Sequence, residues 1–364
     1  MSTALVLAGT KKGLFLIRST DGWATWSVSD QLLGMQSVYG VAVDARGERP
    51  RLFASTHSEH WGPAVAWSDD LGETWSEVRE APVAFPSDVG ASVERVWQIQ
   101  PGPANQPGVV WAGTEPAALF RSADGGESFT LVRSLWDHPH RPQWMPGFGG
   151  QALHTVIPHP HNPQRLLIAI SAGGAYATDD GGETWSASNS GVEAEFMPPG
   201  QRYPEFGQCV HKIDRSPLDP EQLFMQNHGG VYRSDDGGRS WSPIDDGLPA
   251  SFGFGIVAHP ARPGTAYVIP LDSSGHRNTP NAECAVYRTT DSGESWQSVS
   301  KGLPDGFWSI VLRDAFTCDA GDPLGLFLGT RSGEVYGSAD EGESWQQLAA
   351  HLPDVLSVRA AVLD

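Results

Sequence analysis

The chain has 364 residues, of which 39% are hydrophobic, and it contains 42 glycines and 28 prolines. This composition is typical of a turn-rich globular protein with few long helices. The formal net charge of −19 disfavours nucleic acid as a partner, because the chain repels phosphate backbones. The three cysteines, Cys209, Cys284 and Cys318, lack the spacing of a metal finger or a disulfide framework, so we expect a reducing, cytoplasmic location.

The first predicted element lies at residues 4–10, ALVLAGT, which we interpret as a β-strand. Its apolar run is six residues long, and no basic residue precedes it. A run of this length is too short for a signal peptide or a membrane span. We therefore expect neither a leader sequence nor a membrane partner.

A motif of eight residues follows this strand and recurs along the chain, in forms such as STDGWATW and TDDGGETW. It occurs seven times, starting at Ser19, Ser68, Ser122, Thr178, Ser234, Thr289 and Ser338. The starts are 49 to 56 residues apart, and the step from the last start through the C-terminus to the first is 45 residues. A period near 50 with short strands between turns is typical of a β-propeller. We predict an all-β fold, with a single seven-bladed propeller domain of four-stranded antiparallel blades over residues 1–364.

The repeated motif S/T-x-D-x-G-x-x-W is the Asp-box, and the chain resembles the BNR/Asp-box repeat family along its whole length. Two positions depart from the pattern: Gly22-Trp23 displace the usual glycine of the first box, and Phe129 replaces tryptophan in the third. The aspartate can accept backbone hydrogen bonds in the turn, the glycine supplies a positive φ, and the tryptophan packs the turn onto the blade. Because the aspartate recurs in every blade, we interpret it as structural and not catalytic.

The ring is expected to close through the C-terminal strand. In the fifth repeat the four strands read VHKIDRS, QLFMQN, GVYRS and SWSPI. The chain begins with a second-strand pattern, and residues 355–363, VLSVRAAVL, have the pattern of a first strand. We predict that this last strand joins the N-terminal blade and leaves no free inner edge.

One face of the propeller collects the unusual loops. In antiparallel blades, the connections between blades share a face with the loops between the second and third strands. The connections after the second, third and fourth blades are long and contain aromatic residues, histidine and proline. Long loops of this kind on a rigid scaffold commonly carry function, so we predict the functional site on this face.

The sequence Gly-Gln-x-x-His occurs twice, ending at His154 and at His211, 57 residues apart. We expect the two histidines at one equivalent position in neighbouring blades, at the mouth of the central channel. The other blades are expected to place there Tyr39, Val96, Phe254, Trp308 and Val358. Paired imidazoles can bind a divalent metal such as Zn, Mn, Fe or Cu. The predicted metal ligands are His154, His211, His228 and His57, with oxygen candidates at Glu94, Glu115 and Glu205.

An alternative is two hydrogen-bonded histidines that line a wet channel without metal. No organic cofactor is indicated. The predicted catalytic residues are His154, His211, Lys212, Glu94 and Arg95. Arginines on this face can hold a carboxylate or sulfate by paired hydrogen bonds, and aromatic rings can stack on a ligand. The predicted substrate-binding residues are Trp97, Arg141, Gln151, Arg202, Tyr203, Gln208, Arg277, Trp308, Arg331 and Arg359.

The sequence leaves three functions open. The first is a metal-dependent hydrolase or lyase acting on a small polar or acidic substrate, a carbohydrate or a carboxylate. The second is a metal-free glycosidase-like enzyme. Sialidases share the repeat, but their F/Y-R-I-P motif does not occur in this sequence, and Asp-box xyloglucanases use a cleft between two propellers where this chain can build one. The third is a non-catalytic propeller that binds a ligand or a protein as an assembly factor or scaffold.

Overall fold

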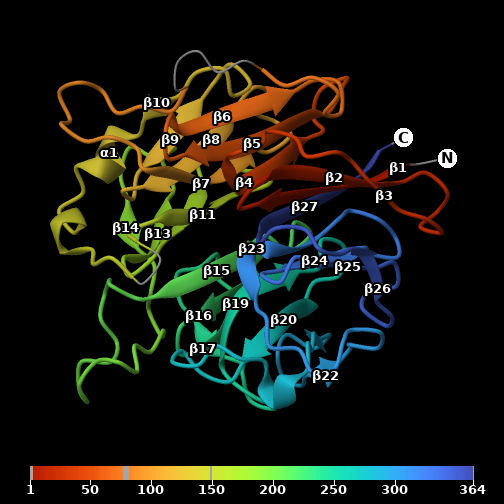
Figure 1. Ribbon diagram of the computed structural model, residues 1–364. Helices are drawn as coiled ribbons and strands as arrows, with labels where there is room; N and C mark the ends of the chain where they lie inside the picture. Colours follow the sequence, from red (N-terminus) through yellow and green to blue (C-terminus); the bar gives the residue numbers. More distant parts are fainter. Residues whose placement is uncertain (1–2, 77–81, 148–149, 364) are drawn as a thin grey trace.

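The β-sheets of the protein are arranged as the blades of a ring in the computed structural model, which describes residues 3–76, 82–147 and 150–363 (Figure 1). There are seven antiparallel sheets, six with four strands and one with three among the described residues. The predicted seven-bladed all-β propeller is confirmed. The described helical segments are short, and they are α1 (Arg133–Trp136), η1 (Arg141–Gln143) and η2 (Pro280–Ala282).

The strands of the first four blades are named from the innermost to the outermost. In blade 1 the innermost strand comes from the C-terminus, and in the others the order is that of the chain. Blade 1 contains β27 (Val355–Leu363), β1 (Thr3–Thr10), β2 (Gly13–Ser19) and β3 (Ser27–Val28). Blade 2 contains β4 (Ser37–Asp44), β5 (Arg51–Ser58) and β6 (Gly62–Ser68). Blade 3 contains β7 (Arg95–Pro101), β8 (Val110–Glu115), β9 (Leu119–Ser122) and β10 (Thr130–Leu131). Blade 4 contains β11 (Leu153–Pro158), β12 (Leu166–Ile170), β13 (Gly174–Thr178) and β14 (Ser186–Ala187).

The remaining blades repeat the same meander. Blade 5 contains β15 (Val210–Arg215), β16 (Leu223–Asn227), β17 (Gly230–Ser234) and β18 (Ser242–Pro243). Blade 6 contains β19 (Phe252–Ala258), β20 (Ala266–Leu271), β21 (Tyr287–Thr289) and β22 (Gln297–Ser298). Blade 7 contains β23 (Val311–Cys318), β24 (Leu326–Thr330), β25 (Val335–Ser338) and β26 (Gln346–Ala349).

Two blades show how the ring is completed. The C-terminal strand β27 pairs with β1 from Thr3 opposite Leu363 to Thr10 opposite Val355, so the predicted closure is confirmed. In blade 2 the backbone N–H of Ser76 donates to the carbonyl of Trp67 at 2.8 Å, where an outer strand would begin. Residues 77–81 lie outside the described ranges.

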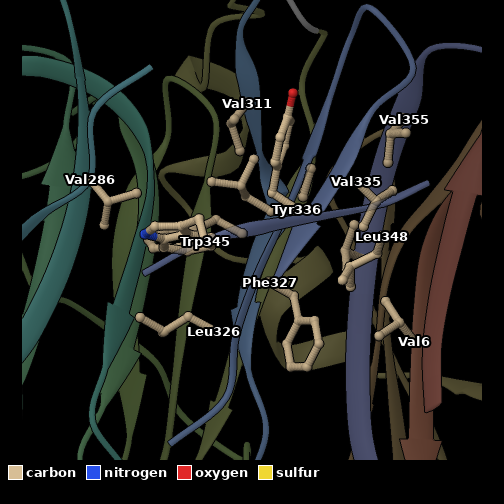
Figure 2. Packing of buried hydrophobic residues seen from close by; sticks show 14 of the residues in the cluster. Val6, Val286, Val311, Leu326, Phe327, Val335, Tyr336, Trp345, Leu348 and Val355 are labelled. Carbon is tan, nitrogen blue, oxygen red and sulfur yellow. The ribbon is translucent and has the colours of Figure 1, made fainter. Parts of the chain in front are cut away.

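Neighbouring blades pack face to face through buried apolar side chains. Around blade 7, one cluster joins Val286 of blade 6, Phe327 of blade 7 and Val6 of blade 1 (Figure 2). Their exposed fractions are 0%, 1% and 0%. Because burying a side chain of this size contributes about 1.5–3 kcal/mol, each interface between blades is a substantial part of the core.

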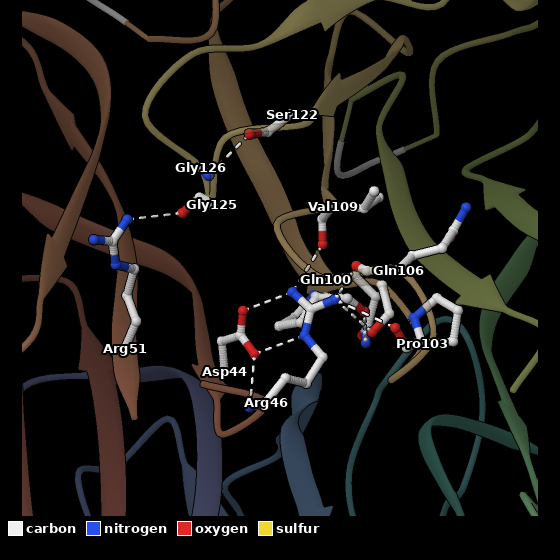
Figure 3. Close-up of polar contacts among 12 residues, drawn as sticks. Asp44, Arg46, Arg51, Gln100, Pro103, Gln106, Val109, Ser122, Gly125 and Gly126 are labelled. Atoms are coloured by element: carbon white, nitrogen blue, oxygen red, sulfur yellow. Dashed lines mark hydrogen bonds and ion pairs between the residues drawn. The ribbon is translucent and has the colours of Figure 1, made fainter. Parts of the chain in front are cut away.

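Polar contacts add to the packing between blades. Arg46, in the first turn of blade 2, donates from Nη1 to the Gln106 carbonyl and from Nη2 to the Val109 carbonyl, both at 2.9 Å (Figure 3). Asp44 accepts from Arg46 Nη2 at 2.6 Å and orients the guanidinium. This arginine therefore connects blade 2 to blade 3 at the rim opposite the long loops.

Every Asp-box forms one local hydrogen-bond pattern, illustrated by the box of blade 4. The Thr178 hydroxyl donates to Asp180 Oδ1 at 2.7 Å, and the Thr184 N–H donates to the same oxygen at 3.0 Å. The Gly182 N–H donates to the Thr178 hydroxyl at 2.9 Å, and Gly182 has a φ of 95°. In the first box Trp23 takes this position with a φ of 72°. The aspartates are thus fully used in holding the turns.

The tryptophan of the box reaches further than its own blade. The indole N–H of Trp241 donates to the Ser188 carbonyl at 2.9 Å, and that of Trp345 donates to the Val299 carbonyl at 2.8 Å. Both carbonyls belong to the outer edge of the preceding blade. The tryptophan therefore joins adjacent blades in addition to packing its turn.

The Asp-boxes should make the fold sensitive to acid. Hydrogen bonds from the residue four positions later, chiefly from its side chain, lower the pKa of Asp21, Asp70 and Asp291 from 3.8 to about 2. A lowered pKa in the folded state means that this stabilisation is present above pH 4 and is lost as the pH falls toward 2. We expect the Tm to fall steeply in this window and Asp70→Asn to flatten the dependence. Thermal melts from pH 2 to pH 6 measure the Tm of the wild type and of Asp70→Asn. An equal dependence of Tm on pH in the two proteins would contradict the prediction.

Candidate functional site

The innermost strand of every blade contains a register shift against its neighbour. In blades 2 to 5 the extra residue is Tyr39, Trp97, His154 and His211 respectively. In blade 1 it is Leu356, in blade 6 Phe254 lies within the shift, and in blade 7 residues 312–315 oppose Gly329. A β-bulge redirects a side chain, so the ring of bulges decides what faces the mouth of the channel.

The bulges show that the residues predicted at the equivalent position of each blade are right in some blades and wrong in others. His154 and His211 do occupy one position in neighbouring blades, and Tyr39 and Phe254 share it. Val96 and Val358 do not, because the extra residue moves the position to Trp97 and Leu356. Trp308 precedes β23, and its place is taken by the irregular segment 312–315.

A cavity of about 320 Å³ lies at the mouth of the channel, on the face of the connections between blades. Its apolar wall comes from the bulges and includes Tyr39, Trp97, Phe254 and Leu356. Its polar lining includes three arginines, Arg277, Arg313 and Arg331, and the group Cys209, His211 and His228. We refer to this space as the mouth cavity.

The arginines give the mouth cavity a positive lining in an acidic chain. The Arg313 guanidinium lies 5.8 Å from the centre of the Trp97 ring, and its Nη1 donates to Ser171 Oγ at 3.3 Å. Arg277 lies 5.6 Å from the centre of the Phe254 ring. Among the described residues that line the cavity, Asp314 is the only carboxylate. The cavity thus combines aromatic faces with positive charge.

A buried ion-pair network lies beneath the mouth cavity. Lys212 Nζ donates to Asp314 Oδ1 at 2.7 Å, and Arg359 Nη2 lies 3.2 Å from the same oxygen. Burial alone would raise the pKa of Asp314, but the two cations outweigh it and hold the pKa below its ordinary value. Lys212 and Arg359 line a second cavity of about 190 Å³, deeper in the channel. Asp314 lines the mouth cavity, but its negative charge is already balanced by Lys212 and Arg359.

His154 is fully buried and has both ring nitrogens occupied. Its Nδ1 lies 3.0 Å from the Thr155 hydroxyl, and its Nε2 lies 3.0 Å from the Val210 carbonyl. Burial, together with the nearby positive charges, lowers its pKa well below the ordinary value. His154 does not line the mouth cavity, so the structure does not bring it to a shared site with His211.

Three side chains of blade 5 converge on one edge of the mouth cavity. The Cys209 sulfur and one ring nitrogen from each of His211 and His228 all lie within 4.8 Å of one another. The Nδ1 of His211 lies 2.5 Å from the Gly253 carbonyl, and its Nε2 lies 3.7 Å from Cys209 Sγ. Burial lowers the pKa of His211 to about 3, so its ring is neutral at pH 7. Two of the four predicted metal ligands, His154 and His57, are not part of this group.

A protein-family comparison matches two of the repeats. Residues 176–187 and 232–243 match the BNR/Asp-box repeat. The match agrees with the seven boxes in the sequence and the seven sheets. The chain is a β-propeller that carries BNR/Asp-box repeats, which we refer to below as the BNR/Asp-box propeller.

Curated relatives of the BNR/Asp-box propeller include proteins named as xyloglucanases. A xyloglucanase of Hypocrea jecorina is 24% identical over 334 residues, covering 79% of this chain and 36% of the relative. An oligoxyloglucan-reducing end-specific xyloglucanase of Emericella nidulans is 25% identical, covering 79% of this chain and 37% of the relative. The chain therefore spans a little over a third of the length of these relatives.

Solved structures support the fold of the BNR/Asp-box propeller. An ancestral GH74 enzyme aligns with a TM-score of 0.58 at 17% identity and covers 89% of this chain and 38% of that one. YCF48 from Cyanidioschyzon merolae aligns with a TM-score of 0.53 at 14% identity, and the alignment covers 87% of this chain and 86% of that one. At this level of identity the likeness concerns the fold alone. Within the described ranges, no helix has the length and apolar character to span a membrane.

The repeated Gly-Gln-x-x-His sequence connects blades in the BNR/Asp-box propeller. Gln151 Nε2 donates to the Trp144 carbonyl at 2.7 Å, and Gln208 Nε2 donates to the Val192 carbonyl at 2.8 Å. Each glutamine thus holds the long loop that precedes it. His154 and His211 bond the carbonyls of Val210 and Gly253, and each of these residues precedes the bulge of the next blade.

Other predicted site residues of the BNR/Asp-box propeller are spread over the same face. Glu94 is exposed, and Arg95 pairs with Glu115 at 2.7 Å. Arg141 lies over the Trp136 ring, and Arg202 pairs with Glu193 at 3.0 Å, both outside the mouth cavity. Arg331 lines the cavity and also pairs with Asp354 at 2.6 Å. Tyr203 and Trp308 are 66% and 69% exposed, and neither lines the mouth cavity.

Sequence reasoning missed several residues that the BNR/Asp-box propeller places at this site, and two of them matter most for its chemistry. Arg313 and Cys209 were not among the predicted ligands, although both line the mouth cavity. Cys209 lies inside the second Gly-Gln-x-x-His sequence, where the first has Ala152. This difference between the two copies was the available signal.

The role of His154 in the BNR/Asp-box propeller can be tested separately. His154→Ala removes the imidazole bond to the buried carbonyl of Val210, which costs about 1–3 kcal/mol of unfolding free energy. Urea denaturation measures the loss, and the exposed His351→Ala serves as the control. A His154→Ala variant as stable as the wild type would contradict the structural role.

Proposed function

We propose that the chain is a carbohydrate-acting hydrolase whose mouth cavity binds an anionic group of its saccharide. The observation that carries the proposal is the convergence of Arg277, Arg313 and Arg331 on one aromatic-walled cavity. Guanidinium groups bind carboxylate or sulfate through paired, charge-assisted hydrogen bonds. Such a lining is unexpected in a chain of net charge −19 unless the cavity serves an anionic ligand.

Aromatic surface around the mouth cavity fits the saccharide part of the ligand. Tyr39, Trp97 and Phe254 form part of the wall, and their ring faces can pack against the C–H surface of a sugar. Outside the cavity, four large side chains on the same face are more than half exposed, namely Trp61, Phe196, Tyr203 and Trp308. An extended saccharide would find further contacts along these rings.

The relatives support the saccharide class. The Hypocrea jecorina and Emericella nidulans proteins are xyloglucanases, and the similarity to each runs through 79% of this chain. Xyloglucan itself is not carried over, because this chain spans little more than a third of those proteins. The proposal is therefore a saccharide with an anionic group, and it differs from the substrate that the relatives' names give.

A second candidate, saccharide binding without hydrolysis, has its own supporting observation. Hydrolysis by acid and base carboxylates requires two such groups about 5–9.5 Å apart. Among the described residues lining the mouth cavity, Asp314 has the only carboxylate, and this carboxylate forms an ion pair with Lys212. Hydrolysis here would need either carboxylates from the rim or a different activating group.

The proposal can be tested by measuring how tightly the protein binds each member of a glycan panel and whether it releases products from them. Oligosaccharides that contain uronate or sulfate should bind more tightly than neutral xyloglucan fragments. Arg277→Ala should weaken the binding by about 10- to 100-fold, the equivalent of a lost charge-assisted bond of about 1.5–3 kcal/mol. Arg141→Ala, on the same face but outside the cavity, is the control and should bind normally.

The outcomes separate the candidates. Release of new reducing ends from a bound acidic glycan, without formation of an unsaturated uronate, would support the hydrolase, and tight binding without release would support the binding protein. Equal, weak binding of acidic and neutral glycans by the wild type and Arg277→Ala would overturn both.

A further inference from the structure

We propose that Cys209, His211 and His228 form a zinc site with one coordination position open to the mouth cavity. The site replaces the predicted set that included His154 and His57. Its place in substrate binding rests on the proposed function, but its existence does not. The donor set of one thiolate and two imidazoles favours Zn²⁺ or copper over Mn²⁺, and Zn²⁺ is the ion to which we commit.

The spacing of the ligand atoms fits a tetrahedral ion. A zinc ion at about 2.3 Å from sulfur and about 2.1 Å from nitrogen, with tetrahedral angles, separates the two ligand atoms by about 3.6 Å. The distance from Cys209 Sγ to His211 Nε2 is 3.7 Å. The third ligand atom, from His228, lies within 4.8 Å of both. Small side-chain rotations are therefore enough to complete the site.

The ring of His211 is already oriented for metal binding. Its Nδ1 donates to the Gly253 carbonyl at 2.5 Å, which places the Nε2 lone pair on the side of Cys209. Histidine ligands of zinc usually donate their second ring N–H to a backbone carbonyl or a carboxylate, which fixes the tautomer and the orientation. The fold supplies this partner to His211 through the backbone of blade 6.

The other two ligands are held on the same rigid element. The backbone N–H of His228, in the turn after β16, donates to the Cys209 carbonyl at 3.0 Å, just before β15. The His228 ring lies 5.5 Å from the His211 ring and 5.2 Å from the Phe252 ring. All three ligand residues line the mouth cavity, so a fourth ligand can come from that side. Three protein ligands with an open position are typical of catalytic zinc sites.

The surrounding charge predicts the nature of the fourth ligand. Arg277 and Arg313 act electrostatically on both Cys209 and His211, and together they disfavour a bare divalent cation. The Cys209 thiolate offsets one charge of the ion, which leaves a net positive site. An anion in the open position, such as a carboxylate of the ligand, would complete the charge balance. We therefore expect zinc and the anionic ligand to strengthen each other's binding.

Cobalt is the probe for this site, because Co²⁺ substitutes for zinc and reports its ligands by absorption. Titration of the chelator-treated protein with Co²⁺ should saturate at one equivalent, with tetrahedral d–d bands and a thiolate-to-cobalt charge-transfer band. Cys209→Ser should lose the charge-transfer band. His228→Asn should lower Co²⁺ affinity at least about tenfold, since even residues behind a metal ligand change affinity by about 10- to 100-fold.

Cys318→Ser is the matched control, because its thiol lines the deeper cavity and not the mouth cavity. This variant should keep both bands. Half-buried His228 provides a second test if Cys209→Ser fails to fold, which circular dichroism would show. The absence of a charge-transfer band in the wild type, or its persistence in folded Cys209→Ser, would overturn the zinc site.

The zinc site and the proposed function fail in different ways. Acidic-glycan binding that is unchanged by chelator, together with no cobalt band, would leave the saccharide proposal standing and remove the metal. A cobalt band with no glycan binding would keep the metal site and remove the saccharide. Glycan affinity that rises at least about tenfold on adding Zn²⁺, corresponding to about 1.4 kcal/mol of coupling, would support both together.

Discussion

Ending the chain after Asp354 should abolish folding of the ring, because residues 355–363 form the innermost strand of blade 1. Strand β27 pairs with β1 along its length, and without it the inner edge of blade 1 is unpaired. Val355 and Val358 are fully buried, and Leu356 is 8% exposed. Each such side chain contributes about 1.5–3 kcal/mol, so their sum is comparable with a net stability of about 5–15 kcal/mol.

The measurement is a thermal melt combined with soluble yield and binding of a hydrophobic dye. A truncated protein should show no cooperative melt and should bind the dye strongly. A circular permutant that begins at Val355 and joins Leu363 to Thr3 by a short linker is the matched control. It keeps the pairing of β27 with β1, whose ends Leu363 and Thr3 lie opposite each other. The permutant should melt near the wild type, and a truncated chain that also did so would contradict the prediction.

The fold was predictable from the sequence because its information is local and repeated. Each Asp-box marks a turn through side-chain bonds that span four residues, as between Asp180 and Thr184. Seven copies at a nearly constant step determine the number of blades, and the pattern of residues 355–363 determines the closure. Neither inference needs contacts between residues that are distant in the sequence.

The candidate site was predictable only in part, because its geometry depends on bulges and on contacts between blades. One extra residue in a strand moves the neighbouring side chains to the opposite face. This is why Trp97 faces the mouth cavity, where the sequence pattern had suggested Val96. The face itself was predicted, and His211, His228, Arg277 and Arg331 line the cavity there.

His154 shows a second limit of the sequence. The two copies of Gly-Gln-x-x-His are equivalent in position, yet the ring of His154 is enclosed while that of His211 borders the cavity. The difference arises from neighbours such as Thr155 and Val210, which occupy both nitrogens of His154. These partners come together only in the folded ring. The proximity of Cys209 to His228 is of the same kind, because it depends on pairing across β15 and β16.

The buried carboxylate beneath the mouth cavity gives the second large expected effect. Asp314→Ala should reduce the free energy of unfolding by about 3–5 kcal/mol, because it removes the carboxylate that pairs with buried Lys212 and with Arg359. Lys212 and Asp314 have side-chain exposures of only 10% and 5%, and Arg359 shares the same carboxylate oxygen. Equilibrium unfolding in urea measures the loss, with Asp88→Ala as the control. Asp88 is paired with Arg133 at an exposed position, where a lost ion pair costs about 0–1 kcal/mol.

A double variant distinguishes the loss of a charge partner from the loss of packing. Asp314→Leu combined with Lys212→Met removes an opposite pair while filling similar volume, and replacing buried pairs by apolar residues is often neutral to within a few kcal/mol. The double variant should therefore be more stable than Asp314→Ala, with the remaining deficit due to Arg359, which keeps its bond to the Val358 carbonyl at 2.9 Å. If Asp314→Ala and Asp88→Ala cost the same, Asp314 is not the charge that neutralises the channel. If the double variant is the least stable of the three, the effect comes from packing and not from unpaired charge.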